Sequence, residues 1–186
     1  MPYFNIVAET SENTVVTEYE PVKKRSDSYQ SEAALEQEFI RLLCEQGYEY
    51  LPIHTEKDLI ANLRKKLEEL NNYQFSDTEW DDFFKNAVAN PNEHIVEKTR
   101  KMQEDNVQVL TRDDGSSKNI TLIDKKNIHN NRLQVINQYV IGTENGAKHD
   151  NRYDVTVLVN GLPLVHIELK RRGVAIREAF NQIKIG

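Results

Sequence analysis

The sequence predicts an α+β (mixed α/β) fold, with a central, mainly antiparallel or mixed sheet flanked by helices. Two observations lead to this prediction. Apolar residues recur at helical spacing over residues 31–103, and short β-branched or alternating runs then follow over residues 107–169. A last helix is expected from about Gly173. Helices and strands that occupy separate blocks of sequence are typical of an α+β layer architecture.

Four helices are predicted ahead of the strands, three of them with an N-cap. Ser31, Thr55 and Ser76 are the expected caps, because a hydroxyl can accept a hydrogen bond from a free N–H of the first turn. An acidic residue follows the second and third caps by three positions, as in a capping box. The predicted helices run from Ser31 to Gln46, from Thr55 through Leu70, from Ser76 to before Asn90, and over about Glu93 to Gln103.

Short strands are predicted after the helices, with turns between them. The turn signals are Asp113-Asp114-Gly115 and Asn160-Gly161. Residues 1–30 are expected to be a polar lead-in to a single domain over 1–186, with some strand character from Thr14 to Tyr19. The predicted strands are Val107–Thr111, Ile120–Ile123, Leu133–Val140, Tyr153–Val159 and Leu164–Leu169.

Composition limits the class of protein. The 186 residues contain 24 Lys and Arg against 30 Asp and Glu, for a net charge of −6, which does not suit a general polyanion binder. No run of 18 apolar residues and no signal peptide is visible, so we expect a cytoplasmic protein without a membrane partner. The single cysteine, Cys44, excludes a disulfide framework and a cysteine-rich zinc site, and we interpret it as a small core or boundary residue.

Residues 151–173 carry the most informative pattern, a strand, a tight turn and a second strand. In the second strand His166, Glu168 and Lys170 are predicted to share one face, opposite a core face that includes Val165. Charged residues in an otherwise apolar strand are costly unless they are paired or used. His166 is interpreted either as a neighbour of the carboxylates or as a plain strand-face histidine. The carboxylate of Asp154, near the start of the first strand, is the candidate partner of this row.

Strand register decides whether Asp154 joins Glu168. A two-residue turn at Asn160-Gly161 would place Asp154 opposite Ile167, on the wrong face. One additional residue is therefore required. We predict that it lies in a three-residue turn, Asn160 to Leu162, or in a β-bulge within either strand.

With that register, Asp154 and Glu168 would form a site for Mg²⁺, or for Mn²⁺ in its place, because such cations prefer oxygen ligands. The backbone carbonyl of Leu169 is a third candidate ligand. Lys170 would orient the attacking water and balance charge at a phosphate. A surface hairpin with an ordinary Glu–Lys pair is the alternative that this short pattern leaves open.

The same segment resembles the PD-(D/E)xK nuclease superfamily, and more narrowly the N-terminal nuclease domain of the R (motor) subunit of type I restriction–modification enzymes. The likeness lies in NRYDVTVLVNGLPLVHIELKRRGVAIREAFNQI, supported by SYQSEAALEQEFIRLLCEQGYEY and LIDKKN. It implies a restriction-endonuclease-like core and a metal-dependent endonuclease that hydrolyses phosphodiester bonds of double-stranded DNA.

The resemblance also assigns roles. Asp154 and Glu168 match the metal-binding acids, Lys170 matches the catalytic lysine, and Gln182 matches the glutamine of the Q-x-x-x-Y motif of RecB-like members. Glu32 is a further metal candidate, with an acid stabilised by the helix dipole as the equal alternative. The basic residues near the end of the sequence are expected to contact DNA, with a solvated basic face as the alternative; they are Arg171, Arg172, Arg177 and Lys184.

One departure from the family pattern supports a rival interpretation. Position 186, four residues after Gln182, is glycine where the pattern has tyrosine. We expect an N-terminal fragment of a longer subunit, in which an ATP-driven translocase follows and which assembles with specificity and methyltransferase subunits. The rival is a catalytically inactive nuclease-like module for DNA binding or restriction-complex assembly.

Overall fold

The computed structural model describes residues 3–9, 15–20, 31–141 and 151–170. The chain divides into two compact units, residues 1–30 and residues 31–186. The first contains an antiparallel hairpin of β1 (Tyr3–Glu9) and β2 (Val15–Glu20). The strand expected at 14–19 is confirmed as β2, but the lead-in carries a second strand that was not expected. The run YFNIV is rich in residues that favour strands, and this signal was available in the sequence.

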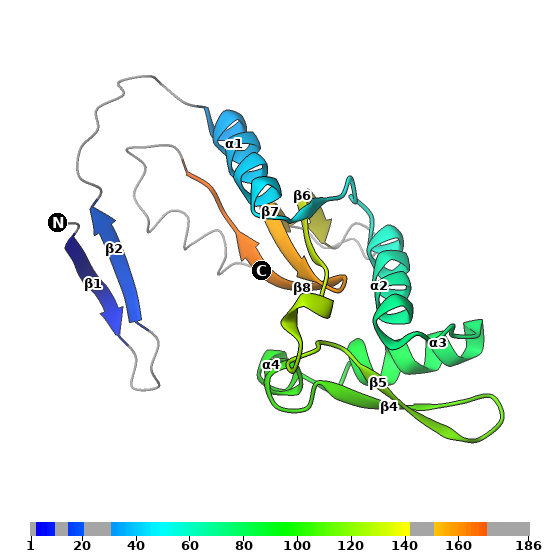
Figure 1. The fold of residues 1–186 in the computed structure, drawn as a ribbon. Coiled ribbons are helices and arrows are strands. Elements are labelled where there is room, and N and C mark those ends of the chain that lie inside the picture. Colours follow the sequence, from blue (N-terminus) through cyan, green and yellow to red (C-terminus); the bar gives the residue numbers. More distant parts are fainter. Residues whose placement is uncertain (1–2, 10–14, 21–30, 142–150, 171–186) are drawn as a thin grey trace. The chain divides into compact units, whose positions relative to one another are not determined.

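The second unit contains the four predicted helices (Figure 1). All three predicted N-caps are confirmed: Ser31 accepts from the N–H of Ala34, Thr55 from that of Asp58, and Ser76 forms a capping box with Glu79. The third predicted helix is divided, because its last turn is π-helical. The observed elements are α1 (Glu32–Glu45), α2 (Glu56–Asn71), α3 (Asp77–Phe83), the π-helix η1 (Phe84–Val88) and α4 (Ile95–Gln103).

A four-stranded mixed sheet forms the centre of the second unit. Its strand order is β3-β6-β7-β8, with β3 parallel to β6 and the other pairs antiparallel. This confirms the α+β class. A short 3₁₀ turn, η2 (Ile128–Asn130), precedes β6. The sheet strands are β3 (Glu49–Tyr50), β6 (Leu133–Ile141), β7 (Asn151–Val159) and β8 (Leu162–Ile167).

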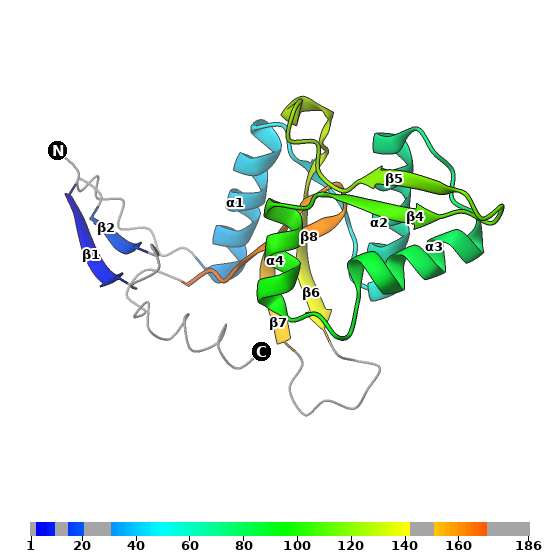
Figure 2. The same cartoon turned by 90° about the horizontal axis from the view of Figure 1, so that it is seen from below.

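The strands β4 (Val107–Thr111) and β5 (Ser117–Thr121) form a sheet of their own, so the expectation of one sheet was wrong for this hairpin. Its two fully buried side chains, Leu110 and Ile120, explain the difference. They pack into a cluster with aromatic rings of the α2–α3 region. Figure 2 shows the β4–β5 hairpin lying apart from the strands of the main sheet. That cluster includes Phe75, Trp80 and Phe83, which are all buried.

The turn between β7 and β8 is tightly held. Asn160 and Gly161 both have positive φ, 52° and 84°, as a two-residue type I′ hairpin turn requires. Asn160 is buried; its side-chain amide donates to Leu122 O and Asn131 Oδ1, and its Oδ1 accepts from the Arg132 N–H. A Cβ on Gly161 would lie 2.6 Å from the Cα of Leu63. The turn therefore packs directly against the backbone of α2.

Two other expectations about burial are corrected by the structure. Cys44 is exposed on α1, so its interpretation as a small core or boundary residue was wrong. Val165 is 48% exposed, although it was predicted to face the core. Both residues lie at the periphery of the unit, since β8 is an edge strand and α1 covers the sheet from outside (Figure 1). Among the described residues, no helix is long and apolar enough to cross a membrane.

Candidate active site

A β-bulge in β8 brings the predicted site together. Val159 pairs with Leu162 and Leu158 with Pro163, after which the register shifts, so that Val157 pairs with Val165. Leu164 is thus the additional residue. The bulge alternative is confirmed and the three-residue turn was wrong. Pro163 beside the bulge has no N–H to give to a ladder, which suits an edge strand.

The shifted register brings Asp154 opposite Glu168 on the neighbouring strand. The last printed pair of the ladder joins Val155 to Ile167, and one further step places Asp154 opposite Glu168. Asp154 Oδ2 accepts a hydrogen bond of 2.8 Å from the Leu169 N–H. The side chain of Glu168 is only 8% exposed. Two carboxylates therefore stand at the end of the hairpin that is remote from its turn.

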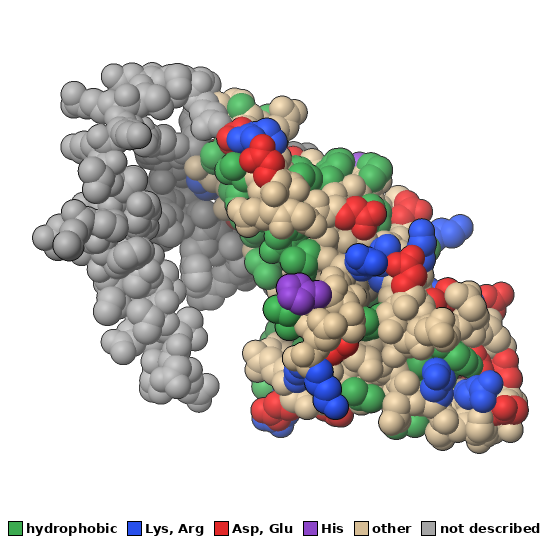
Figure 3. All heavy atoms as spheres, in the orientation of Figure 1, with side chains coloured by type: hydrophobic (Ala, Val, Ile, Leu, Met, Phe, Trp, Pro, Cys, Tyr) green, Lys and Arg blue, Asp and Glu red, His purple; other side chains and the backbone are tan. Residues whose placement is uncertain are grey.

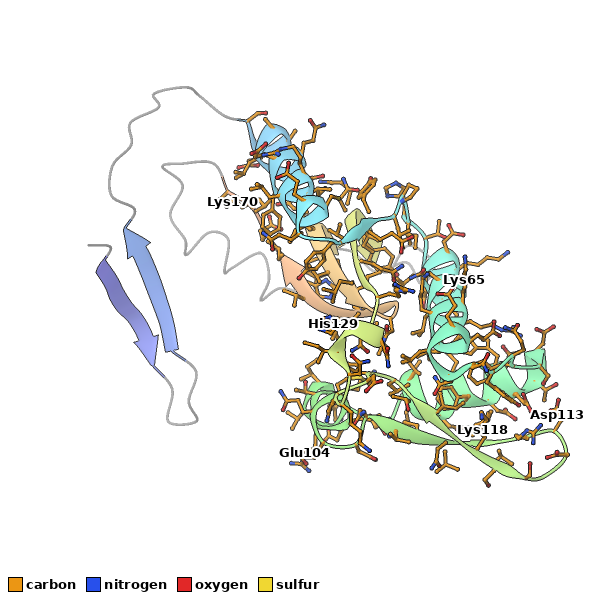
Figure 4. All side chains as sticks on the ribbon, in the orientation of Figure 1. Lys65, Glu104, Asp113, Lys118, His129 and Lys170 are labelled. Carbon is orange, nitrogen blue, oxygen red and sulfur yellow. The ribbon has the colours of Figure 1, made fainter. Side chains whose placement is uncertain are left out.

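Lys170 completes this group. Its Nζ donates to Glu168 Oε1 at 2.6 Å, and its side chain is 18% exposed. Burial by itself lowers the pKa of Lys170, but the hydrogen bond and charge of Glu168 outweigh that effect, and the charges of Glu32 and Asp154 add to it. The net result is a raised pKa, so Lys170 remains a cation beside the two acids. Figure 4 shows its position just after the end of β8.

Glu32 lies near enough to act on this group through its charge. It is the first residue of α1 and is exposed, and its carboxylate helps to raise the pKa of Lys170. The structure thus brings four predicted residues into one neighbourhood: Asp154, Glu168, Lys170 and Glu32.

Comparison with known proteins supplies the family. The family model described as "Type I restriction enzyme R protein N terminus" matches residues 29–185. The chain belongs to this family. Similar proteins are the type I restriction enzyme EcoprrI endonuclease subunit of Escherichia coli (50% identity over 178 residues, 95% of this chain) and the SsaAORF53P endonuclease subunit of Staphylococcus saprophyticus (39% over 160 residues, 83% of this chain). The HindI endonuclease subunit of Haemophilus influenzae is 31% identical over 176 residues and 83% of this chain.

The chain is shorter than these relatives. It spans 56% of the length of the Escherichia coli subunit and 16% of the lengths of the other two. The match therefore concerns the N-terminal region of a type I restriction R protein.

The oxygen atoms of this R-protein region suit a hard divalent cation. Asp154 and Glu168 offer carboxylates and Leu169 offers a backbone carbonyl, whereas Mg²⁺ typically takes one or two carboxylates and keeps several waters. Across the described residues, no group of three or more His, Cys, Asp or Glu side chains that could hold a metal is found. Two carboxylates and a carbonyl are oxygen donors, and oxygen donors suit Mg²⁺ or Mn²⁺ better than they suit a closed zinc site, which takes nitrogen and sulfur donors.

His166 contacts two residues of the adjacent strand, β7. Its Nδ1 lies 2.9 Å from Thr156 Oγ1, and its ring stacks on Tyr153 with centroids 4.1 Å apart. Burial lowers the pKa of its imidazole. These contacts agree with the interpretation as a strand-face histidine.

Several predicted residues lie outside the described part of the chain, and their roles stay predictions. They are Gln182, Arg171, Arg172, Arg177 and Lys184, together with the helix expected from Gly173. On the face drawn in Figure 3, acidic and basic side chains are interspersed over the described part. Within the described part of the chain, Lys101 forms an ion pair with Glu93.

Sequence reasoning missed three residues beside the site: Glu36, Asn137 and Gln138. The carboxylate of Glu36 accepts from the side-chain amides of both Asn137 and Gln138. A signal for Glu36 was present, because it follows Leu35 within the apolar stripe of α1. Nothing local in the sequence marks Asn137 or Gln138, since polar residues are common in strands.

Proposed function

We propose that this chain is the metal-dependent endonuclease domain of a type I restriction R subunit and that it hydrolyses phosphodiester bonds of double-stranded DNA. The observation that carries the proposal is the bulge at Leu164, which places Asp154 opposite Glu168. A plain hairpin would not need it. Membership of a family whose members are named endonuclease subunits supports the same function.

Each residue of the site has a separate role in the proposed hydrolysis. Asp154, Glu168 and the Leu169 carbonyl would hold Mg²⁺, which when bound polarises a phosphate oxygen and lowers the pKa of water. The Leu169 N–H fixes one oxygen of Asp154. Lys170 keeps its positive charge and would stabilise negative charge that develops on the phosphate. In the reaction a water oxygen bonds to phosphorus, one P–O ester bond breaks, and the leaving oxygen takes a proton.

We further propose that the domain contacts the DNA backbone and that base sequence is selected elsewhere. Contacts to phosphates carry no sequence information by themselves. Specificity and methyltransferase subunits would supply the selection, and an ATP-driven translocase region would follow this domain. The relatives are named as endonuclease subunits, which implies a complex of several subunits, and the particular partners follow from the family resemblance.

Calorimetric titration of Mn²⁺ into the chain tests the metal site directly. We expect wild type to bind Mn²⁺ and folded Asp154→Ala to show no measurable binding, because one of the two carboxylates is gone. Glu168→Gln provides a second test that leaves the Leu169–Asp154 hydrogen bond in place. Asp82→Ala, which removes an exposed carboxylate on α3, is the matched control and should bind as wild type.

Circular dichroism establishes that each variant is folded. Failure of the folded wild type to bind Mn²⁺ would contradict the proposal and favour the inactive docking module. Equal binding by wild type and Asp154→Ala would also contradict it, because the metal would then lie elsewhere.

A further inference from the structure

The strand β6 has an irregular backbone beside the proposed site. Gln138 has φ 53°, in the left-handed region that residues other than glycine rarely adopt. The β6–β7 ladder pairs Asn137 with Val155 and Tyr139 with Tyr153, so Gln138 and Asp154 face each other between these pairs. They are not themselves a ladder pair. The distortion is therefore centred opposite the proposed metal-binding acid.

Glu36 forms hydrogen bonds with two residues at this distortion. Its Oε1 accepts from Asn137 Nδ2 at 2.6 Å, and its Oε2 accepts from Gln138 Nε2. Neighbouring residues of a regular strand point to opposite faces. The left-handed backbone at Gln138 breaks this alternation, and the amides of Asn137 and Gln138 bind the same carboxylate. Glu36 is 9% exposed and is the one buried residue of α1, all of whose residues the structure describes.

The amide of Gln138 is not fully satisfied by this arrangement. Its Nε2 donates a hydrogen bond to Glu36. Its Oε1 is buried and has no hydrogen-bond partner among the described residues. A strained backbone, a buried carboxylate and an unpartnered buried oxygen are each unfavourable. A tie between α1 and the sheet could be made from apolar residues without any of them. Such costs concentrate at functional sites.

We propose that Glu36 and Gln138 are positioning residues of the nuclease site, in that Glu36 locks the bend of β6 at Gln138 and this bend sets the place of the Asp154 carboxylate. The inference rests on the proposed function. Glu32 and Glu36 lie one helical turn apart and hence on the same side of α1. The helix would thus act on the site twice, with the charge of Glu32 near Lys170 and with the hydrogen bonds of Glu36 at β6.

Two readouts test the proposal in Glu36→Gln. The first is the affinity for Mn²⁺, which we expect to fall by roughly 10–100-fold, as when a partner that orients a metal ligand is lost. The second is hydrogen exchange of the Leu169 amide, which donates to Asp154 Oδ2 and so reports the place of that carboxylate without any metal. We expect this exchange to be faster by about tenfold.

Matched controls separate positioning from general loss of stability. Glu38→Gln changes an acid on the same helix that is exposed and pairs with Arg41, and it should alter neither readout. The Leu122 amide, which donates to Asn106 O, should exchange as in wild type in every variant.

Gln138→Gly keeps the proposal testable if Glu36→Gln does not fold. Glycine adopts a positive φ without penalty, so the fold should persist while the tie to Glu36 is lost. We expect weaker Mn²⁺ binding and faster Leu169 exchange here too. Wild-type values of both in folded variants would overturn the proposal, as would an equal rise in exchange at Leu122. If wild type binds no Mn²⁺, the proposed function fails, and Leu169 exchange still decides whether Glu36 and Gln138 position Asp154.

Discussion

The two ends of the β7–β8 hairpin are built from the same strands but are stabilised in different ways. At the turn, the polar atoms of the Asn160 side chain have partners, and Gly161 packs on α2. At the other end stand Asp154 and Glu168, opposite a strained Gln138 that has an unpartnered oxygen.

This difference indicates that the two ends of the hairpin have different roles, one in stability and the other in the proposed site. The turn end satisfies its polar groups and contributes stability, and the bulge at Leu164 lies between the two ends. The end remote from the turn, here called the open end, carries the charges of Asp154 and Glu168 and faces the strained backbone and unpartnered oxygen of Gln138. Protein structures tolerate such features mainly where function needs them. Changes at the turn should therefore affect unfolding, and changes at the open end should affect metal binding.

A change of register beyond the bulge is the strongest way to test this division. Insertion of one alanine between Val165 and His166 moves the residues that follow by one step along the ladder, so that Asp154 would face Ile167 instead of Glu168, and we expect Mn²⁺ affinity to fall by more than about 100-fold. Leu164→Ala keeps the register and should bind nearly as wild type does. Calorimetry measures both. Retained binding in the insertion variant would show that the strand register does not assemble the site.

Substitution at the turn should lower the free energy of unfolding, whereas changes at the open end should weaken Mn²⁺ binding. Gly161→Ala adds a Cβ 2.6 Å from the Leu63 Cα at a φ of 84°, and we expect a loss of about 3 kcal/mol in the free energy of unfolding. Gly115→Ala is the matched control, with a similar φ of 79° but open space around it, and should cost about 1 kcal/mol. Urea denaturation measures both values. Equal losses would mean that the approach of α2 to the turn has no energetic effect.

The smallest expected effect concerns the loop that supports the turn. Hydrogen bonds from the Asn127 N–H, from the Asn130 side chain and from the Lys126 N–H outweigh burial and hold the pKa of Asp124 below its ordinary value of 3.8. A carboxyl with a lowered folded-state pKa stabilises the protein above its unfolded pKa, and this contribution is lost as pH falls through the folded value. Asp124 also bonds through its backbone to Asn131, which accepts from Asn160.

We therefore expect the Asp124 contribution to be present at pH 6 and to be lost progressively below about pH 4. Asp124→Asn should be less stable than wild type at pH 6, and the difference should shrink at pH 3. Urea midpoints at the two pH values measure this. A difference that does not change with pH would show that the charge of Asp124 is not what supports the loop.

Local rules were enough to predict much of the molecule from its sequence. N-caps at Ser31, Thr55 and Ser76 and the turn at Asn160-Gly161 depend on residues within a few positions of one another. The need for one additional residue in the hairpin followed from the alternation of side chains alone. So did the expectation that Asp154, Glu168 and Lys170 belong together.

Other features depend on contacts between distant segments, which no local pattern records. The tertiary structure decided that the additional residue is Leu164 and that the β4–β5 hairpin packs on the aromatic cluster rather than on the main sheet. It also decided that Glu36 bonds to Gln138, 102 positions away. A bulge forms where the edge of a sheet allows it, and a buried carboxylate bonds whichever donors the packed helix brings to it. The sequence by itself thus determined which residues could do the chemistry, and only the packing of α1 on the sheet decided how they are held.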